Sequence, residues 1–384
     1  MQDTFITKIH INKVRHLTDV DIELSDIERK HLILTGKNGS GKTSLLDALR
    51  DVVAFLQRTM ADNTHLTRID YIPLLKNMNM KMNCIDVFYS HNDVNLANVI
   101  FAYIPAVRSS FALPQAIELI DIKDKTLIID NKSFNFLKYI LNLDYQLYGA
   151  QNDKNKTLEA NLSKWFANFT RALQEIYDCK ELKLQRDTKN LAFKIEIPDR
   201  EPFGLHEMAD GYKAFLEIYM ELIMRFENAD AVIEYGQPAI VLIDEVETHL
   251  HVELQKRALP FLTQLFPNVQ FIITTHSPFV ITSLSNAVVY DLEKREQLDN
   301  PSYYSYEAVV ESFLDADMYS QEMKRQLDRY KELCFKTQKT GEENEEFLRI
   351  KTELELMSPA SKELFIAFRA LEQQRKEAKN DQTN

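Results

Sequence analysis

A run of eight residues near the N-terminus has the types and the spacing that hold phosphate groups. The run consists of Gly36, Lys37, Asn38, Gly39, Ser40, Gly41, Lys42 and Thr43, with Ser44 next, and it fits G-x-x-x-x-G-K-[ST]. Glycine lets backbone amides approach a phosphate closely, and the N-terminus of a helix attracts anions. We therefore predict that Gly36 and residues 38–44 hold a phosphate chain. Lys42 would reach its β and γ phosphates, and the Thr43 hydroxyl would bind Mg²⁺.

The residues on both sides of this run support its interpretation as a phosphate loop. Residues 31–35 are apolar enough for a strand, and apolar residues recur with helical spacing between 45 and 53. The motif requires this order of a strand, a glycine-rich loop and a helix. A chance match is disfavoured because the chain has only 8 glycines and three of them lie in this run.

Two carboxylates, Asp244 and Glu245, directly follow a second apolar run, residues 240–243. Continuous apolar runs are typical of parallel strands covered on both faces, and sites form at the carboxyl ends of such strands. The same pattern also fits a core strand that stops at a polar loop, so this segment alone does not decide. In a site, Asp244 would hold Mg²⁺ and Glu245 would act as the general base that orients an attacking water.

A histidine follows a third apolar run, residues 269–274, and would lie at the same edge of the sheet as the two acids. Placed there, His276 could donate a hydrogen bond to the γ-phosphate of a nucleotide. The alternative is a zinc site made of His249, His251 and His276. No fourth ligand is indicated for it, and the first two are only two residues apart where a loop turns into a helix.

Asp210 and Gly211 stand just before a segment with helical spacing, residues 214–226. An acid and a glycine at this place form either a second anion-binding helix N-terminus or only a turn and a cap. The position favours a role in the site, because one helix and a short linker separate these residues from the strand that ends at Asp244.

The order and spacing of these motifs resemble the ABC-type ATPase head shared by RecF, SMC and OLD-family proteins, over about residues 1–295. In particular, they resemble the RecF/OLD-like AAA ATPases of bacterial defence and retron operons. Residues 8–15 resemble the opening strand and loop of that group, residues 208–213 its signature, residues 244–251 its Walker B and D-loop, and residues 275–278 its switch histidine. Met208 and Ala209 replace the usual Leu and Ser of the signature.

The resemblance implies that ATP and Mg²⁺ are bound by a head-to-tail homodimer, with two ATP molecules at the interface between the subunits. The implied catalytic residues are Lys42, Glu245 and His276, and the implied metal ligands are Thr43 and Asp244. Arg15 would contact the nucleotide in its own subunit, whereas Asp210 and Gly211 would reach the ATP of the other subunit. Whether a higher oligomer forms is left open.

The expected fold class is α/β, with an ABC-type P-loop ATPase head whose mixed sheet is flanked by helices. We predict residues 1–104 as the ATPase half with the phosphate loop (Walker A), and residues 105–200 as an insertion lobe of helices and antiparallel strands. Residues 201–295 would form the half with the signature, Walker B and the switch histidine, and residues 296–384 a helical extension. A strand pair is expected between residues 117 and 129. Arg108 could contact a phosphate or a partner, although a plain surface arginine is the simpler interpretation.

Composition narrows the classes of partner. The 384 residues carry a net charge of −12, which argues against a broad basic surface, although a local basic groove for nucleic acid stays open. No segment is apolar over the length of a bilayer, so a membrane partner is not expected. The start lacks a signal peptide, and the three cysteines, Cys84, Cys179 and Cys334, form no ligand or disulfide pattern. We therefore expect a cytoplasmic protein.

The leading hypothesis for function is an ATP-driven switch that regulates a separate effector, a nuclease or a toxin, in bacterial anti-phage defence. The defence context rests on analogy with the resembling group. The alternative is a RecF-like ATPase of DNA repair and recombination, which would bind duplex DNA in a salt-sensitive way. A transporter ATPase fits less well, because about 165 residues lie between the phosphate loop and the signature.

Overall fold

The computed structural model of the chain contains two compact units, Met1–Leu314 and Asp315–Asn384. The described residues are 4–62, 84–90, 99–107, 136–187, 190, 192–227, 232–314, 321–336 and 338–355. Arg108 and the strand pair expected between residues 117 and 129 lie outside them. Residues 296–314, which the sequence assigned to the helical extension, fall within the first unit. The domain boundaries proposed at residues 104, 200 and 295 stay predictions.

A six-stranded sheet forms the centre of the first unit, in the order β12-β11-β3-β10-β9-β5. The strands are β3 (His31–Thr35), β5 (Ile100–Ile104), β9 (Ala239–Ile243), β10 (Val269–Thr274), β11 (Ala287–Asp291) and β12 (Glu296–Asp299). Strand β12 runs antiparallel to β11, and all other neighbours are parallel. Every residue of β3, β9, β10 and β11 is buried, because their apolar runs are covered on both faces of the sheet.

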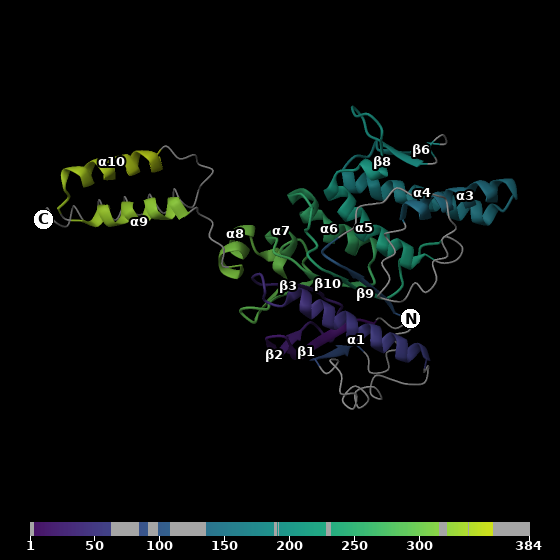
Figure 1. Cartoon of the computed structure of the whole chain (residues 1–384), viewed down its shortest axis with the longest axis horizontal. Coiled ribbons are helices and arrows are strands. Elements are labelled where there is room, and N and C mark those ends of the chain that lie inside the picture. The colour runs from purple at the N-terminus through teal and green to yellow at the C-terminus, as the bar shows by residue number, and fades with distance from the viewer. Residues whose placement is uncertain are drawn as a thin grey trace. The chain divides into compact units, whose positions relative to one another are not determined.

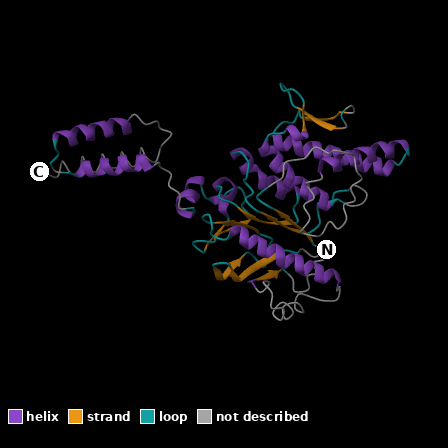
Figure 2. Cartoon of the chain, in the orientation of Figure 1, coloured by secondary structure: helices purple, strands orange, loops and turns teal. Residues whose placement is uncertain are grey.

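Alternate side chains of each strand pack on opposite faces of this sheet. In β9, Val241 belongs to one hydrophobic cluster and Ile240 to another. The cluster of Ile240 also contains residues of α1 (Lys42–Asp62), and the cluster of Val241 contains residues of α5 (Asp210–Phe226) and α6 (Val252–Leu265). The sheet therefore lies between α1 on one side and α5 and α6 on the other (Figure 1, Figure 2). This arrangement confirms the predicted α/β class with a mixed sheet flanked by helices.

A small antiparallel sheet packs on the same side as α1, in the order β2-β1-β4. Its strands are β1 (Ile6–Val14), β2 (Leu17–Glu23) and β4 (Ile85–Tyr89). Strands β1 and β2 form a hairpin in which Val14 pairs with Leu17, so the turn consists of Arg15 and His16 alone. Arg15 takes a positive φ of 55° in this tight turn. The hairpin places its turn beside the phosphate loop, as shown below.

A helical lobe extends from the other side of the sheet, near α5. It contains α3 (Phe136–Asn152) and α4 (Lys156–Tyr177), followed by a small sheet of β6 (Lys183–Asp187), β7 (Ala192–Glu196) and β8 (Phe203–Gly204). Trp165 of α4 anchors the lobe, with its ring centroid 5.4 Å from that of Phe169 and 6.0 Å from that of Tyr139. The antiparallel pairing of β6 and β7 agrees with the helices and hairpin expected in this region.

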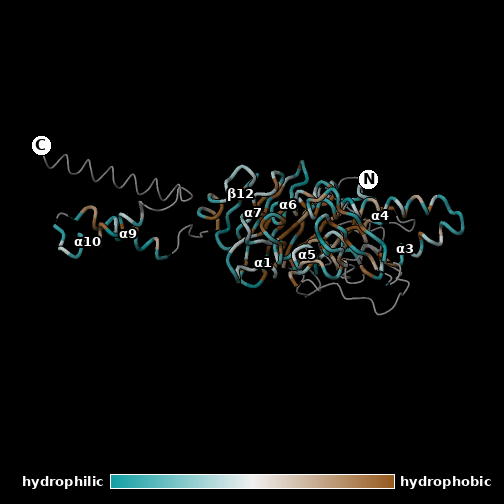
Figure 3. The backbone as a smooth tube through the Cα atoms, turned by 90° about the horizontal axis from the view of Figure 1, so that it is seen from above, coloured by the Kyte–Doolittle hydropathy of each residue, from teal (hydrophilic) through white to brown (hydrophobic). Residues whose placement is uncertain are grey.

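Short helical elements complete the first unit. They are a 3-10 helix at Leu205–Glu207, α7 (Pro278–Ile281), a 3-10 helix at Pro301–Tyr303, α8 (Tyr306–Ala308) and a π-helical turn at Val309–Phe313. Figure 3 shows the hydrophobic stretches gathered in the interior of this unit, among the central strands. Within the described part of the chain, every helix is too short or too polar to cross a bilayer.

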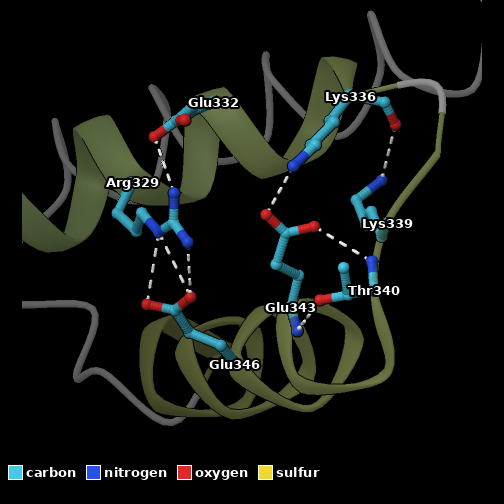
Figure 4. A network of polar contacts seen from close by, with 7 residues as sticks. All are labelled: Arg329, Glu332, Lys336, Lys339, Thr340, Glu343 and Glu346. Carbon is cyan, nitrogen blue, oxygen red and sulfur yellow. Dashed lines mark hydrogen bonds and ion pairs between the residues drawn. The ribbon is translucent and has the colours of Figure 1, made fainter.

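The second unit is described over two helices, α9 (Gln321–Phe335) and α10 (Gly341–Glu355). Tyr330 and Phe347 stack with ring centroids 5.1 Å apart, and the core adds only Leu333, Cys334 and Ile350 as buried residues. Charged side chains link the outer surfaces of the two helices (Figure 4).

The polar network of this helix pair centres on Arg329. Its guanidinium donates to both carboxylate oxygens of Glu346, with Nη2 2.8 Å from Oε2, and to Glu332 at 2.8 Å. Lys336 and Glu343 form a second pair. The Arg329 and Glu346 side chains are each about one third exposed, 34% and 33%. Water screens such pairs, so the stacked aromatic rings contribute more to holding the helices together.

Candidate functional site

The predicted catalytic and metal-binding residues lie together at the carboxyl edge of the central sheet. Strand β3 leads into the phosphate loop, β9 ends one residue before Asp244, and β10 ends two residues before His276. The parallel register pairs Thr274 with Leu34 and Ile273 with Ile243, so all three strands stop at the same level. Sites in open α/β sheets form at this edge.

The phosphate loop has the backbone that its glycines permit. Gly36, Gly39 and Gly41 have φ values of 129°, 89° and 102°, in the region that residues with a side chain rarely adopt. A Cβ on Gly36 would lie 2.8 Å from the Ser40 hydroxyl oxygen and 3.3 Å from Oδ1 of Asp291. Gly36 is therefore required both by its backbone angle and by the close approach of its neighbours.

Lys42, the lysine of the motif, is folded back over the loop that precedes it. Its Nζ donates to the Gly36 carbonyl at 2.7 Å and to the Lys37 carbonyl at 3.2 Å. Burial lowers the pKa of the Lys42 ammonium. Four carboxylates oppose that shift: Glu245, Asp244, Glu247 and Asp291. Lys42, the single buried cation of the loop, therefore lies near four acidic side chains.

Thr43 and Asp244 are in direct contact, as expected for two ligands of one Mg²⁺ ion. The Thr43 hydroxyl lies 2.9 Å from Oδ2 of Asp244 and 3.3 Å from Oδ1. A hydroxyl has one proton and two lone pairs, so Thr43 can donate to Asp244 and still offer oxygen to a metal. Mg²⁺ is commonly held by one or two carboxylates together with phosphate oxygens. The donor set of Thr43 and Asp244 fits that ion.

Glu245, the proposed general base, stands at a strained point of the backbone. Its φ is 44°, a left-handed value that costs a residue with a side chain about 1–2 kcal/mol. Its amide donates to the Thr274 hydroxyl at 2.7 Å, and the Thr248 hydroxyl lies 3.4 Å from its Oε2. The turn away from β9 gives Glu245 a different direction from Asp244.

His276 is held by an acid that the sequence analysis did not include in the site. Its amide donates to Oε1 of Glu247 at 2.6 Å. His276 Nε2 and Glu247 Oε2 are buried, and among the described residues neither has a hydrogen-bond partner. Burial lowers the pKa of the His276 imidazole, Lys42 lowers it further, and Glu247 and Glu245 act in the opposite direction. The ring is therefore neutral at neutral pH and has one nitrogen available to a ligand.

A pocket of about 300 Å³ opens beside the phosphate loop. Its lining residues are His16, Leu17, Asn38, Gly39, Ser40, Leu292, Glu293 and Arg295. A Cβ on Gly41 would lie 3.0 Å from Leu17 Cδ1 and 3.5 Å from His16 Cε1. The β1–β2 turn therefore packs directly against the loop. Arg15, the predicted contact in this turn, is exposed and does not line the pocket, so its role stays a prediction.

Asp210 and Gly211 begin α5, as predicted, and lie against the segment after Glu245. A Cβ on Gly211 would lie 2.7 Å from the His249 carbonyl oxygen and 3.6 Å from Cδ2 of His251. The Asp210 side chain is 83% exposed, and its Oδ1 is 3.7 Å from Nζ of Lys213.

The zinc site considered in the sequence analysis has no counterpart in the described part of the chain. There, no three His, Cys, Asp or Glu side chains gather as metal ligands, and this includes the three histidines considered for zinc.

Three further residues of the site were missed by sequence reasoning: Thr274, Glu247 and Asp291. Thr274 lies between Asp244 and Glu245, and its Oγ1 is 2.6 Å from Oδ1 of Asp244. Asp291 ends β11, is 3% exposed, and accepts hydrogen bonds from the amides of residues 293 and 294 at 2.8 and 3.0 Å. Each is a polar residue at the end of an apolar strand or just after one. That position is a signal that could have identified them.

Comparisons with known proteins place part of the chain in a family and find distant relatives. The family model described as "AAA domain, putative AbiEii toxin, Type IV TA system" (AAA_21) matches residues 82–282. The chain is 26% identical over 221 residues to "Retron Ec83 probable ATPase" of Escherichia coli, covering 54% of this chain and 38% of that protein. It is 24% identical over 324 residues to "Septu protein PtuA" of Bacillus mycoides (strain KBAB4), covering 76% of this chain and 41% of that protein.

The chain thus spans only about two fifths of the length of these curated relatives. Among solved structures, an SmcHead bound to the C-winged helix domain of ScpA is 14% identical, with a TM-score of 0.44. That match covers 78% of this chain and 100% of the solved one. Because the family model matches more than half of its residues, the chain belongs to the AAA_21 family of ATPase domains, whose phosphate loop implies ATP binding.

Proposed function

We propose that this protein binds and hydrolyses ATP with Mg²⁺, forms a dimer around the nucleotide, and uses that cycle to regulate an effector protein. The observation that carries the proposal is the contact between the Thr43 hydroxyl and Asp244 at 2.9 Å. It joins the phosphate loop to an acid 201 residues later in the chain, beside Glu245 and His276. This combination supports phosphoryl transfer to water.

Each residue then has a role in hydrolysis. The loop amides and Lys42 would hold the phosphates, and Thr43 and Asp244 would hold Mg²⁺, which when bound draws charge from the phosphate oxygens. Glu245 would take a proton from the attacking water as its oxygen bonds to the γ-phosphorus. The bond to the bridging oxygen breaks, giving ADP and inorganic phosphate. His276, neutral and with Nε2 available, would donate a hydrogen bond to the γ-phosphate.

The pocket beside the loop would take the nucleoside. It adjoins Asn38, Gly39 and Ser40, so a nucleotide held by the loop can place its sugar and base there. Leu17 and Leu292 offer apolar surface, and His16, Glu293 and Arg295 offer polar groups that can orient a ligand. This supports ATP as the ligand rather than a free phosphate.

The place of the signature residues supports the proposed dimer. Gly211 packs on the His249 carbonyl, and the Asp210 side chain points into solvent. A second subunit arranged head-to-tail could present these residues to the γ-phosphate of the first. Hydrolysis would then remove the group that bridges the two chains, which is how ATP could act as a switch.

We propose that this ATPase acts in bacterial anti-phage defence. This role rests on the retron and Septu relatives and on the resemblance to ATPases of bacterial defence operons. We propose that the effector is a nuclease or a toxin acting as a separate chain, and that the protein works in the cytoplasm. The net charge of −12 gives no support to the DNA-repair alternative.

The substitution Glu245→Gln tests this function. It removes the base but keeps the size of the side chain, so turnover should fall about 10²–10⁴-fold while ATP still binds. Because ATP would persist, the variant should form an ATP-dependent dimer, measured by light scattering with ATP, ADP and no nucleotide.

The matched control is Glu253→Gln, on the exposed side of α6 with 77% of its side chain accessible, which should behave as wild type. If Glu245→Gln hydrolysed ATP at the wild-type rate, Glu245 could not be the general base. A size that never responds to nucleotide would overturn the dimer. ATPase activity stimulated by duplex DNA in a salt-sensitive way would favour the repair alternative.

A further inference from the structure

The geometry points to Thr274 as the positioning residue of this site, which orients the metal-binding acid and the general base together. The inference rests on the proposed function, because it assigns Thr274 a task in the hydrolysis of ATP. Thr274 is the last residue of β10 and is fully buried. It is not placed to touch the reacting atoms itself and would act through Asp244 and Glu245.

Thr274 binds three consecutive residues of the chain that leaves β9. Its hydroxyl oxygen lies 2.6 Å from Oδ1 of Asp244 and 2.7 Å from the amide nitrogen of Glu245. Its backbone carbonyl accepts the amide of Val246 at 3.2 Å. Thr274 therefore contacts both the metal-binding acid and the base.

The register of the sheet explains why residue 274 can orient Asp244 and Glu245. Ile243, the last residue of β9, pairs with Ile273 of β10. Residues 244–246 no longer follow the strand and pass over the next residue of β10, which is Thr274. A side chain at position 274 can therefore form hydrogen bonds to the turn of residues 244–246.

The direction of the two hydroxyl bonds is fixed by proton counting. The Glu245 amide can only donate, so Thr274 Oγ1 accepts there, and its single proton goes to Asp244. Thr43 gives its own proton to the other oxygen of Asp244. Asp244 therefore has one hydroxyl donor on each carboxylate oxygen, which fixes the plane of the group.

The same hydroxyl stabilises the unusual backbone at Glu245. With φ at 44°, this residue turns out of the strand, and its amide no longer faces a strand partner in the ladder of β9. The Thr274 hydroxyl satisfies that amide instead. Without it, the turn that aims the base would lose its hydrogen bond, and the base and the metal ligand would shift relative to each other.

The test compares Thr274→Val, Thr274→Ser and Thr35→Val. Valine keeps the shape of threonine but removes the hydroxyl, whereas serine retains it. Thr35, at the end of the neighbouring strand β3, is also fully buried, and its hydroxyl has no hydrogen-bond partner among the described residues. Thr35→Val therefore reports the general effect of removing a buried hydroxyl at a strand end.

Three measurements are made on the full-length protein. Hydrogen exchange of the Glu245 amide, without nucleotide, should be at least about tenfold faster in Thr274→Val. The Mg²⁺ dependence of binding to a non-hydrolysable ATP analogue should shift about 10–100-fold to higher Mg²⁺, and kcat should fall by a similar factor. Thr274→Ser should restore all three values towards wild type, and Thr35→Val should leave them unchanged.

The inference is overturned if Thr274→Val matches wild type in amide exchange and in Mg²⁺ dependence. It is also overturned if Thr274→Val weakens analogue binding equally with and without Mg²⁺, because that outcome describes a loss of packing. A wild-type protein that binds the analogue but never hydrolyses ATP would overturn the proposed ATPase. The exchange and Mg²⁺ measurements would still decide the role of Thr274.

Discussion

His31 is a buried histidine outside the site, and it ties the pH dependence of stability to the central sheet. It begins β3, and its Nδ1 accepts the amide of Phe271 in β10 at 3.1 Å. Burial, together with the smaller effect of the charge of Arg29, lowers the pKa of the His31 imidazole to about 4. The unfolded chain, with an ordinary histidine pKa near 6.5, therefore binds this proton more readily than the folded protein.

The stabilising contribution of neutral His31 should be complete above about pH 7 and should be lost as the pH falls towards 4. Between pH 7.5 and 5 this single group should reduce the free energy of unfolding by about 2 kcal/mol. In His31→Asn the side chain can still accept the Phe271 amide but does not titrate. Urea titrations at several pH values should show a flatter profile for the variant, and parallel profiles would contradict the assignment.

At the scale of elements, the start of α5 and the segment after Glu245 are packed so closely that only glycine fits between them. Gly211 has no unusual φ, so the restriction comes from space alone. A Cβ there would lie 2.7 Å from a backbone oxygen of His249, which cannot rotate away as a side chain would. The start of helix α5 is therefore in direct backbone contact with this segment.

Gly211→Ala should separate these two elements without touching the phosphate loop. We expect nucleotide affinity within about threefold of wild type and ATP hydrolysis lowered by at least about tenfold, because the signature would no longer meet the second subunit correctly. The control is Gly236→Ala, where the nearest atom, Asn268 Nδ2, lies 3.9 Å from the added Cβ. Equal hydrolysis rates in the two variants, measured by phosphate release, would show that the contact is dispensable.

The elements that the sequence predicted well are those whose position follows from chain order alone. The carboxyl ends of parallel strands converge, so apolar runs followed by Gly36, Asp244 and His276 were sufficient to predict one site. The mixed sheet and its helices followed from the same patterns. Strand β12 was missed, because its residues are largely exposed and carry no apolar alternation.

Contacts that depend on the register between distant segments could not be predicted in this way. The support of Glu245 by Thr274 requires β10 to extend one residue beyond the paired end of β9. The approach of the β1–β2 turn to Gly41, and that of Gly211 to His249, depend on how whole elements pack. No local pattern of residue types encodes these distances.

At the scale of the whole molecule, the negative charge around Lys42 matches the negative net charge of the protein. Four carboxylates act on the one buried cation of the loop, in a chain whose net charge is −12. ATP is a polyanion, so its long-range approach is opposed by the field of the protein, and attraction begins only near the loop amides and the metal. Salt weakens such long-range forces, because the Debye length falls from about 30 Å at 0.01 M to about 8 Å at 0.15 M.

Nucleotide capture should therefore become faster as salt is added, the reverse of the behaviour of enzymes that steer charged ligands inward. Stopped-flow measurements with a fluorescent ATP analogue at constant free Mg²⁺ should show an association rate about two- to threefold higher at 0.15 M than at 0.01 M salt. Glu293→Gln, which removes one negative charge from the pocket wall, should flatten that rise. A rate that falls with salt would mean that a local positive potential governs the encounter. If the rise is observed, ATP is captured through short-range contacts with the loop and the metal. High ionic strength in the cell would then favour binding of ATP to the protein.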